Sequence, residues 1–477
     1  MEEALLFEKT SPGRIGYSLP ALDVPQCQPS LHLQRKTLSL PELSEPDVVR
    51  HYTRLAQWNF SIDQNFYPLG SCTMKYNPKI NDWAASLPGF AGLHPQTPDS
   101  FSQGALKLMY ELSSMIKNLS GLDAVSLLPL AGAQGEYTGL RLISAYYEAR
   151  GEKRTKILIP DTAHGTNPAS CSLTGFCVVK IPITSEGILS LERIQKEVTK
   201  DVAALMLTHP NTLGYLEENI KEISDILHEK GALLYCDGAN FNAFAGLAQV
   251  RDFGVDVVQF NLHKTFSTPH GGGGPGSGPV AVDKKLEPFL PVPIISKNHD
   301  SYALNWDRPQ SIGSLSAFYG NFGILVRAYT YMKTLGLEGM RRMAHMAILN
   351  ANYIRSRLKN HFHLPYPKRF CLHETIFDDS LQNKHGFTTL DMAKRLLDYG
   401  YHPPTIYFPL VVHGSMMIEP TESESKQTLD AFCDVMIKIS EEGKKNPDFL
   451  KKAPYTTKVR RVDEVHAARN PKLVYKA

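Results

Sequence analysis

The feature that most constrains the fold is an alternation of short apolar runs with amphipathic stretches between residues 156 and 260. Helices are expected at 191–198 and 220–229, the second with Ile220, Ile223 and Leu227 on one face. Apolar runs separated by helices are typical of a largely parallel sheet that is covered on both faces. The predicted strands of this α/β sheet are 156–159, 177–181, 203–208, 232–236 and 255–258.

The segments on either side of this alternation differ from it in character. Residues 1–80 contain many prolines and few periodic runs, so we expect an arm that lies over the protein or a neighbouring subunit. Residues 81–322 form the large α/β domain in this prediction and include an early helix at about 100–119. From residue 323 long helical stretches are followed by short strands, which predicts a smaller α+β domain and tail over 323–477.

Polar residues follow three of the predicted strands at the point where each strand ends. Each group alone is typical of a turn, because Asp, Asn, Gly and Pro favour turns. In parallel sheets, however, ligands bind beyond the carboxyl ends of the strands. The groups are 161–168 with His164, 209–214 with Asn211 and Thr212, and 237–240 with Asp237 and Asn240.

A lysine follows the last of these strands. Lys264 lies between His263 and Thr265, and the glycine run Gly271–Gly274 comes shortly after it. An amine that leaves a strand for a desolvated pocket is disfavoured in its charged form and is therefore free to form a Schiff base. A surface lysine beside a flexible loop is the alternative. The glycine run is interpreted as a passage without side chains, where the backbone can approach a cofactor or a neighbouring subunit.

Pyridoxal phosphate needs a lysine for its aldehyde, a carboxylate for its ring nitrogen and N–H donors for its phosphate. Lys264, Asp237 and the small-residue turn at 131–136, which opens a helix, offer these three groups, although such a turn is also explained by packing alone. We expect His164 to stack on the ring and Asn211 or Thr212 to reach its phenolic oxygen. The predicted catalytic residues are Lys264, His164 and Asp237, and the predicted cofactor-binding residues add Ala133, Gln134, Gly135, Glu136, Asn211, Thr212, Asn240 and His263.

Charge and cysteine content exclude several classes of protein. A formal net charge of +3 over 477 residues is too small to indicate nucleic acid or membrane binding. The start of the chain lacks the features of a signal or transit peptide, so a cytoplasmic enzyme is expected. The seven cysteines include no Cys-x-x-Cys pair, which predicts reduced thiols. A metal is not expected: the spacing of His361, His363, Cys371 and His373 matches no zinc pattern and favours a solvated loop.

Four motifs together resemble a known family. They are Tyr67-Pro-Leu-Gly-Ser-Cys-Thr-Met-Lys-Tyr-Asn77, Ala163-His-Gly-Thr-Asn-Pro-Ala-Ser170, Asp237-Gly-Ala-Asn240, and His263-Lys-Thr265 with its glycine run. The sequence is similar, over nearly its whole length, to the P-protein of the glycine cleavage system. It is most similar to the lysine-bearing C-terminal half, which occurs as a separate subunit in the split form of the enzyme.

The resemblance implies a fold, a reaction and partners. The implied fold is that of the type I pyridoxal-phosphate enzymes, related to aspartate aminotransferase, with pyridoxal phosphate as an aldimine on Lys264. The implied reaction decarboxylates glycine and passes the aminomethyl group to the lipoyl disulfide of H-protein. The implied assembly is two copies of this chain with two copies of a second subunit, glycine dehydrogenase subunit 1. The motif also implies that Cys72 lies near the entrance of the site.

Two other readings remain open from the sequence. Serine hydroxymethyltransferases also handle glycine and also place His-Lys-Thr before a glycine-rich turn, although they lack the motif at 67–77. Alternatively, the chain is a non-catalytic subunit that only supports its partner. The motif at 67–77 itself is either the lining of a pocket or a packed connecting loop.

Overall fold

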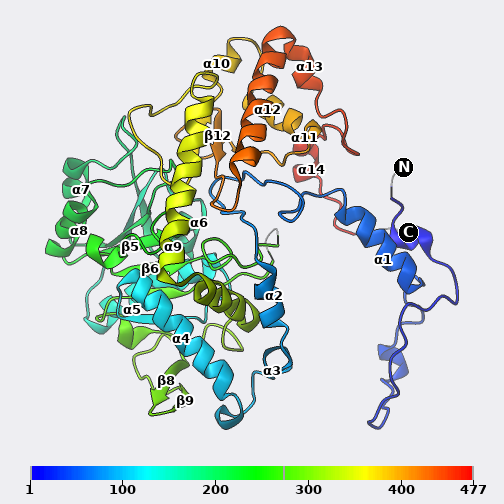
Figure 1. Cartoon of the computed structure of the whole chain (residues 1–477). Coiled ribbons are helices and arrows are strands. Elements are labelled where there is room, and N and C mark those ends of the chain that lie inside the picture. Colours follow the sequence, from blue (N-terminus) through cyan, green and yellow to red (C-terminus); the bar gives the residue numbers. More distant parts are fainter. Residues whose placement is uncertain (1–2, 272–273, 475–477) are drawn as a thin grey trace.

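The apolar runs form the centre of a seven-stranded sheet in the computed structural model, which describes residues 3–271 and 274–474 (Figure 1). The strand order is β1-β7-β6-β5-β4-β2-β3, and β7 alone runs antiparallel to its neighbours. The predicted mostly parallel sheet is therefore confirmed. Its strands are β1 (Ala124–Ser126), β2 (Lys156–Pro160), β3 (Cys177–Ile181), β4 (Val202–Thr208), β5 (Leu233–Gly238), β6 (Val257–Phe260) and β7 (Val280–Val282).

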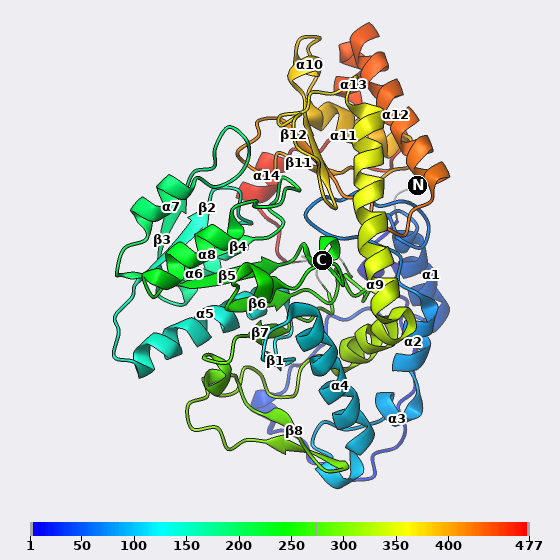
Figure 2. The same cartoon turned by 60° about the vertical axis from the view of Figure 1, so that its left-hand side comes forward.

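Side chains of the central strands alternate between two apolar cores. Leu158, Leu205 and Leu234 share one register row and face one core, whereas Ile157 and its row face the other. Because both faces are buried, the strands read as continuous apolar runs. One face packs against α5 (Gly132–Ala149) and α6 (Thr166–Leu173). The other packs against α4 (Gln103–Ser120), α7 (Leu191–Glu197), α8 (Ile220–Glu229) and the first part of α9 (Phe322–Leu358), as Figure 2 shows.

A second, smaller sheet lies above the carboxyl ends of the large one. It is antiparallel, with the order β10-β12-β11, and its strands are β10 (Thr375–Asp378), β11 (Thr405–Ile406) and β12 (Ser415–Ile418). Its core contains Phe362, Phe377 and Phe432 and the C-terminal part of α9. The helices around it are α10 (Ser380–Asn383), α11 (Thr389–Asp398), α12 (Lys426–Lys445) and α13 (Pro447–Lys452).

Two helical predictions differ from the structure in instructive ways. The long helical stretches expected from residue 323 begin with one continuous element, α9, which bends at Gly336. Gly336 has φ 60°, a left-handed conformation that glycine adopts most easily. The polar run at 161–168, which alone is also typical of a turn, ends in the first residues of α6. Pro168 is tolerated there because it falls in the first helical turn, where its missing N–H forfeits no helical bond.

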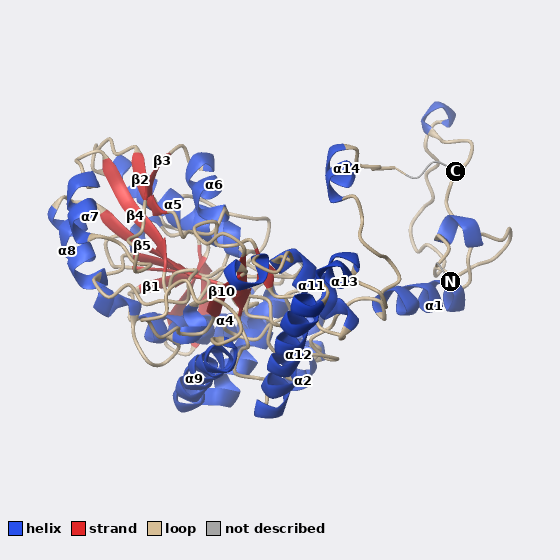
Figure 3. Ribbon diagram, turned by 90° about the horizontal axis from the view of Figure 1, so that it is seen from above, coloured by secondary structure: helices blue, strands red, loops and turns tan. Residues whose placement is uncertain are grey.

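The N-terminal arm extends away from both sheets (Figures 1 and 3). It contains α1 (Glu45–Ala56), a helix that the sequence analysis did not anticipate, and it leads through α2 (Lys79–Ala85) and α3 (Pro88–Ala91) into the large sheet. Ile15 and Leu31 of the arm are 76% and 87% exposed. The C-terminal helix α14 (Glu464–Arg469) lies on the same side of the molecule (Figure 3), and the remaining elements are the hairpin strands β8 (Ile294–Asn298) and β9 (Ser301–Asn305).

The division of the chain at residues 80 and 322 stays a prediction. All seven cysteines are free thiols, as expected. No helix within the described residues has both the length and the apolar character needed to cross a membrane. Gly272 and Gly273, the centre of the predicted glycine passage, lie outside the described residues.

Candidate active site

Asp237 and Lys264 lie at the carboxyl ends of two adjacent parallel strands. Asp237 lies near the end of β5, paired in register with Gln259 of β6, and Lys264 follows β6 by four residues. Asp237 is only 1% exposed. Its carboxylate accepts hydrogen bonds from the Ala239 N–H (3.0 Å) and from side chains on three other elements, Asn167 (3.1 Å), Thr208 (3.3 Å) and Gln259. These donors fix the carboxylate at the sheet edge where ligands of parallel sheets bind.

Within the described residues, Lys264 has a single hydrogen-bond acceptor. Its Nζ donates to the backbone carbonyl of Ser71 at 2.9 Å, and the side chain is half-buried. Ser71 belongs to the 67–77 motif, so the structure brings that motif next to the lysine. An amine with one weakly competing neighbour is available for reaction with a carbonyl compound.

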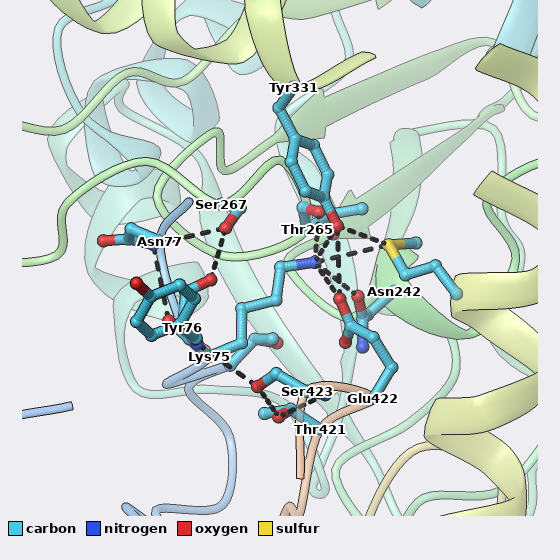
Figure 4. Close-up of polar contacts among 12 residues, drawn as sticks. Lys75, Tyr76, Asn77, Asn242, Thr265, Ser267, Tyr331, Thr421, Glu422 and Ser423 are labelled. Atoms are coloured by element: carbon cyan, nitrogen blue, oxygen red, sulfur yellow. Dashed lines mark hydrogen bonds and ion pairs between the residues drawn. The ribbon is translucent and has the colours of Figure 1, made fainter. Parts of the chain in front are cut away.

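A second lysine of this region, Lys75, is bound quite differently (Figure 4). Its side chain is 3% exposed, and its Nζ donates to the Thr265 carbonyl (2.6 Å) and to Glu422 Oε1 (2.8 Å). Asn242, Tyr331 and Met343 complete the surroundings of the amine. Burial lowers the pKa of Lys75, and Glu422 opposes that shift. Lys75 therefore has a structural role: it ties the motif to the loop that carries Lys264.

The first turn of α5 approaches the Lys264 loop closely. A methyl group added at Gly132 would clash with Asn261 Oδ1, and one added at Gly135 would lie 2.6 Å from the Gly278 carbonyl. Within the described residues the buried Asn261 Oδ1 has no hydrogen-bond partner. The N–H groups at the start of an α-helix lack intrahelical acceptors and bind anions. Ala133 and Gln134 thus lie in the helix terminus that adjoins the lysine loop.

The Glu136 side chain faces α6. Its carboxylate accepts hydrogen bonds from Thr166 Oγ1 (2.7 Å) and Ser170 Oγ (3.0 Å). Burial and the charge of Asp237 raise the pKa of Glu136 to about 7. Thr166 also contacts His164 Nδ1 at 2.9 Å, so the network runs from α5 to His164. Partial desolvation and the Lys264 ammonium lower the pKa of His164, which favours its neutral form.

The remaining predicted residues divide into two groups. His263 adjoins the site: burial and then Lys264 lower its pKa to about 3, and its buried Nδ1 has no partner in the described part of the chain. Asn211 instead bonds the Gly187 carbonyl and the N–H groups of Leu213 and Tyr215. Thr212 bonds the Thr162 carbonyl, and Asn240 bonds the Pro210 carbonyl. The side chains of these three residues are thus engaged in holding the loops beyond β2, β4 and β5.

Sequence reasoning missed two acids that lie beside Lys264. Glu374 and Glu419 are fully buried and are bonded to the 67–77 motif through Ser71 and Thr73. Burial and then Glu419 raise the pKa of Glu374 well above its usual range, and burial raises that of Glu419 to about 7. An acid next to an apolar strand, as in Met416-Met417-Ile418-Glu419, was the signal available in the sequence.

The histidine and cysteine residues considered as metal ligands take separate partners. His363 bonds Asp378, and Cys371 contacts Asn352. His373 lies in the acid cluster, where one of its ring nitrogens and one oxygen each of Glu374 and Glu419 lie within 4.8 Å of one another.

These features fit pyridoxal phosphate. The orphaned Asn261 oxygen, the glycine cradle at α5, the buried Asp237 and the Lys264 amine meet at one edge of the sheet. The N–H groups at the start of α5, the Asp237 carboxylate and the Lys264 amine match the phosphate, ring nitrogen and aldehyde of that cofactor. Fold and site together define a pyridoxal-phosphate-dependent enzyme with the aspartate aminotransferase type of fold.

Comparisons with known proteins place the chain within that class. Residues 15–305 match the family "Glycine cleavage system P-protein" and residues 343–454 match "Glycine dehydrogenase, C-terminal domain". The chain belongs to the glycine cleavage system P-protein family. It is 54% identical over 474 residues to the probable glycine dehydrogenase (decarboxylating) subunit 2 of Caldanaerobacter subterraneus, covering 98% of each chain. It is 54% identical over 480 residues to the protein of the same description from Halalkalibacterium halodurans, covering 99% of this chain and 98% of the other.

Solved structures confirm the fold. A glycine decarboxylase (P-protein) of the glycine cleavage system superimposes with a TM-score of 0.70 at 21% identity, covering 88% of this chain and 92% of that one. An aspartate aminotransferase from Thermus thermophilus superimposes with a TM-score of 0.59 at 14% identity, covering 79% and 99%. The predicted type I fold is therefore correct.

Proposed function

We propose that the protein is the pyridoxal-phosphate-dependent subunit of glycine dehydrogenase (decarboxylating), and that Lys264 holds the cofactor covalently. The observation that carries this proposal is the contrast between two lysines in one region. Lys75 is surrounded by acceptors, whereas Lys264 has a single carbonyl acceptor in the part of the chain that the structure describes and emerges beside Asp237. Family membership supports the same assignment.

Each residue of the site has a proposed task. When bound, the cofactor supplies an electron sink for the electrons released as CO2 leaves. Asp237 holds the proton on the ring nitrogen, and the N–H groups of Ala133 and Gln134 bind the phosphate. His164, held by Thr166, orients the ring from one side. Lys264 would bond to the aldehyde of the cofactor and, once released from it, would take up or release a proton at Nζ.

The carboxylate of glycine leaves as a neutral molecule, so a site that excludes water favours the step. The polar residues at the base of this site are shielded from water: each of Asp237, Asn167 and Thr208 is at most 5% exposed. Burial also lowers the pKa of His263 to about 3, so this residue adds no charge beside Lys264 at neutral pH.

Two partners complete the proposed reaction. We propose that the chain assembles with a second subunit, two copies of each, because the relatives are described as subunit 2. We propose that the aminomethyl group passes to the lipoyl disulfide of H-protein. In that transfer the bond to the carboxylate breaks, a carbon–sulfur bond forms, the disulfide is reduced and one sulfur takes a proton.

Carboxyl-labelled glycine tests the reaction. The protein is incubated with its partner subunit, H-protein and pyridoxal phosphate, and released CO2 is counted. We expect label in CO2 that depends on H-protein. Transfer of the label into serine when a one-carbon donor is added would favour a hydroxymethyltransferase, and a protein that never takes up the cofactor would contradict the assignment.

A further inference from the structure

Three acids near the small sheet bind alternate residues of the 67–77 motif. Glu374 Oε2 accepts the Ser71 N–H at 2.8 Å, and Glu419 Oε1 accepts the Thr73 hydroxyl at 2.6 Å. Glu422 Oε1 accepts Lys75 Nζ at 2.8 Å, the contact drawn in Figure 4. Ser71 in turn offers its carbonyl to Lys264 Nζ. The acids therefore hold the backbone segment on which the Lys264 amine rests.

Two of these acids lie close together without water access. Glu374 and Glu419 are both 0% exposed, and their facing atoms lie within 4.8 Å of one another. Glu374 Oε1 and Glu419 Oε2 have no hydrogen-bond partner in the described ranges. Two carboxylates in such a setting cannot both be ionised near neutral pH, so they share a proton and titrate as a pair.

The surrounding charges leave Lys264 as the cation that faces the pair. Glu422 balances Lys75. Burial lowers the pKa of His373 to about 3, so its ring is neutral. Burial also raises the pKa of the Cys72 thiol, which keeps it protonated. The titratable or charged groups that face the pair are His373, Cys72, Lys75, Glu422 and Lys264.

We propose that Glu374 and Glu419 share one proton, and that the single negative charge left on the pair stabilises the cationic form of the nitrogen through which Lys264 would bond to the cofactor. The inference rests on the proposed function, in which Lys264 holds the cofactor. Both acids are positioning residues: they act on Lys264 through charge and through the Ser71 backbone. A cationic nitrogen makes the attached carbon a better target for the amino group of glycine.

Spectroscopic titration of four variants tests this inference. The visible absorbance of the bound cofactor is followed against pH in E374Q, E419Q, the double variant E374Q/E419Q and the control E217Q. Glu217 is also a buried acid, 3% exposed, but it bonds the Leu189 N–H in another part of the large domain. Glutamine keeps the shape and the acceptor oxygen of glutamate, so the hydrogen bonds to Ser71 and Thr73 survive.

The expected pattern is not additive. In each single variant the remaining acid ionises and the charge persists, so the midpoint moves by less than about 0.3 pH units. In the double variant the charge is lost, and the midpoint at which the cationic form disappears falls by about one pH unit or more. E217Q leaves the midpoint unchanged. An unchanged midpoint in the double variant, or a shift in each single variant of about half the shift in the double variant, would overturn the inference.

Infrared spectroscopy covers the case in which the double variant fails to fold. If the pair shares one proton, wild type has an infrared band of one protonated carboxyl group at neutral pH. Either single variant should lose this band, because the remaining acid is then ionised. A band that persists in both single variants contradicts the shared proton. Wild-type protein without any cofactor absorbance would instead contradict the proposed function, which separates the two failures.

Discussion

Lys264 and Lys75 differ at the residue scale in the number of acceptors around the amine. Lys75 donates to a carboxylate, a carbonyl and a side-chain amide, whereas Lys264 donates to one carbonyl. A buried ammonium with good partners is costly to disturb, because any replacement strands the facing Glu422. Replacing the two lysines should therefore have different consequences.

Lys264→Ala is expected to lower CO2 release from glycine by at least about a thousandfold, because the group that exchanges with substrate and moves protons is lost. Its thermal unfolding should stay close to that of wild type. Lys75→Met should instead lower the unfolding temperature clearly, since it leaves the charge of Glu422 unpaired. The labelled-glycine assay and calorimetry on both variants check this, and normal turnover in Lys264→Ala would contradict it.

His209 gives a prediction of pH dependence. It is 1% exposed, its ring nitrogens have no partners in the described ranges, and burial lowers its pKa to about 3. The unfolded state, with a pKa near 6.5, binds more protons below that pH, so stability falls as pH falls from 6.5 toward 3. His209→Phe can pack between Phe244 and Phe253, and it should remove this loss of stability at low pH.

Between pH 7 and pH 5 the effect of His209 amounts to about 2 kcal/mol. Urea unfolding at both values should show His209→Phe gaining that amount relative to wild type on acidification. A stability difference that does not depend on pH would show that the His209 pKa is not depressed.

The sequence could predict that two site residues lie close together when they belong to strands that are neighbours in the chain. It could not predict such proximity for residues that are far apart in the chain. Asp237 and Lys264 follow neighbouring strands of one βαβ-like pattern, so their proximity was predictable. Glu374 and Glu419 bond residues that lie 303 and 346 positions away in the chain. No local periodicity encodes such a contact, and an acid at the end of a strand looks like an ordinary turn residue.

At the scale of elements, the start of α5 is the most constrained helix terminus near the site. Gly132 and Gly135 pack against the Asn261 side chain and the Gly278 backbone, with no space for a methyl group. Because the two segments pack so closely, the N–H groups of the first turn of α5 lie next to the loop that carries Lys264. The glycine-rich pattern predicted this helix start, but packing and phosphate binding could not be distinguished without the neighbours.

Gly132→Ala is expected to weaken the binding of pyridoxal phosphate by about tenfold or more, which corresponds to about 1.4 kcal/mol. The added methyl group displaces Asn261 and widens the gap between α5 and the lysine loop. Gly104→Ala is the matched control, because Gly104 lies in the first turn of α4 with open space around it. Fluorescence titration with the cofactor measures both, and equal affinities in the two variants would contradict a phosphate seat at α5.

At the scale of the whole molecule, the N-terminal arm, residues 1–80, exposes several large apolar side chains to solvent. Ile15, Leu19 and Leu31 are between 76% and 87% exposed on a segment that projects from the body (Figure 3). Exposed apolar surface of this kind marks interaction sites. We expect the arm to bind the partner subunit, and the irregular, proline-containing sequence is suited to an extended strap.

The double variant L19E/L31E should bind the partner subunit at least about tenfold more weakly, because two buried apolar contacts become charged. Phe370→Glu serves as the control, since Phe370 is 87% exposed but belongs to a loop near the small sheet. Analytical ultracentrifugation of the mixed subunits gives both affinities. Unchanged affinity of L19E/L31E for the partner subunit would show that these residues of the arm do not contribute to the interface.

The central claim is that Lys264 is the residue that bonds to pyridoxal phosphate. Borohydride reduction of the yellow holoprotein, followed by peptide mass mapping, tests it most directly. We predict loss of the yellow colour and a single reduced adduct on the peptide that contains Lys264. An adduct on Lys75 or on any other lysine, or no adduct at all, would contradict the account.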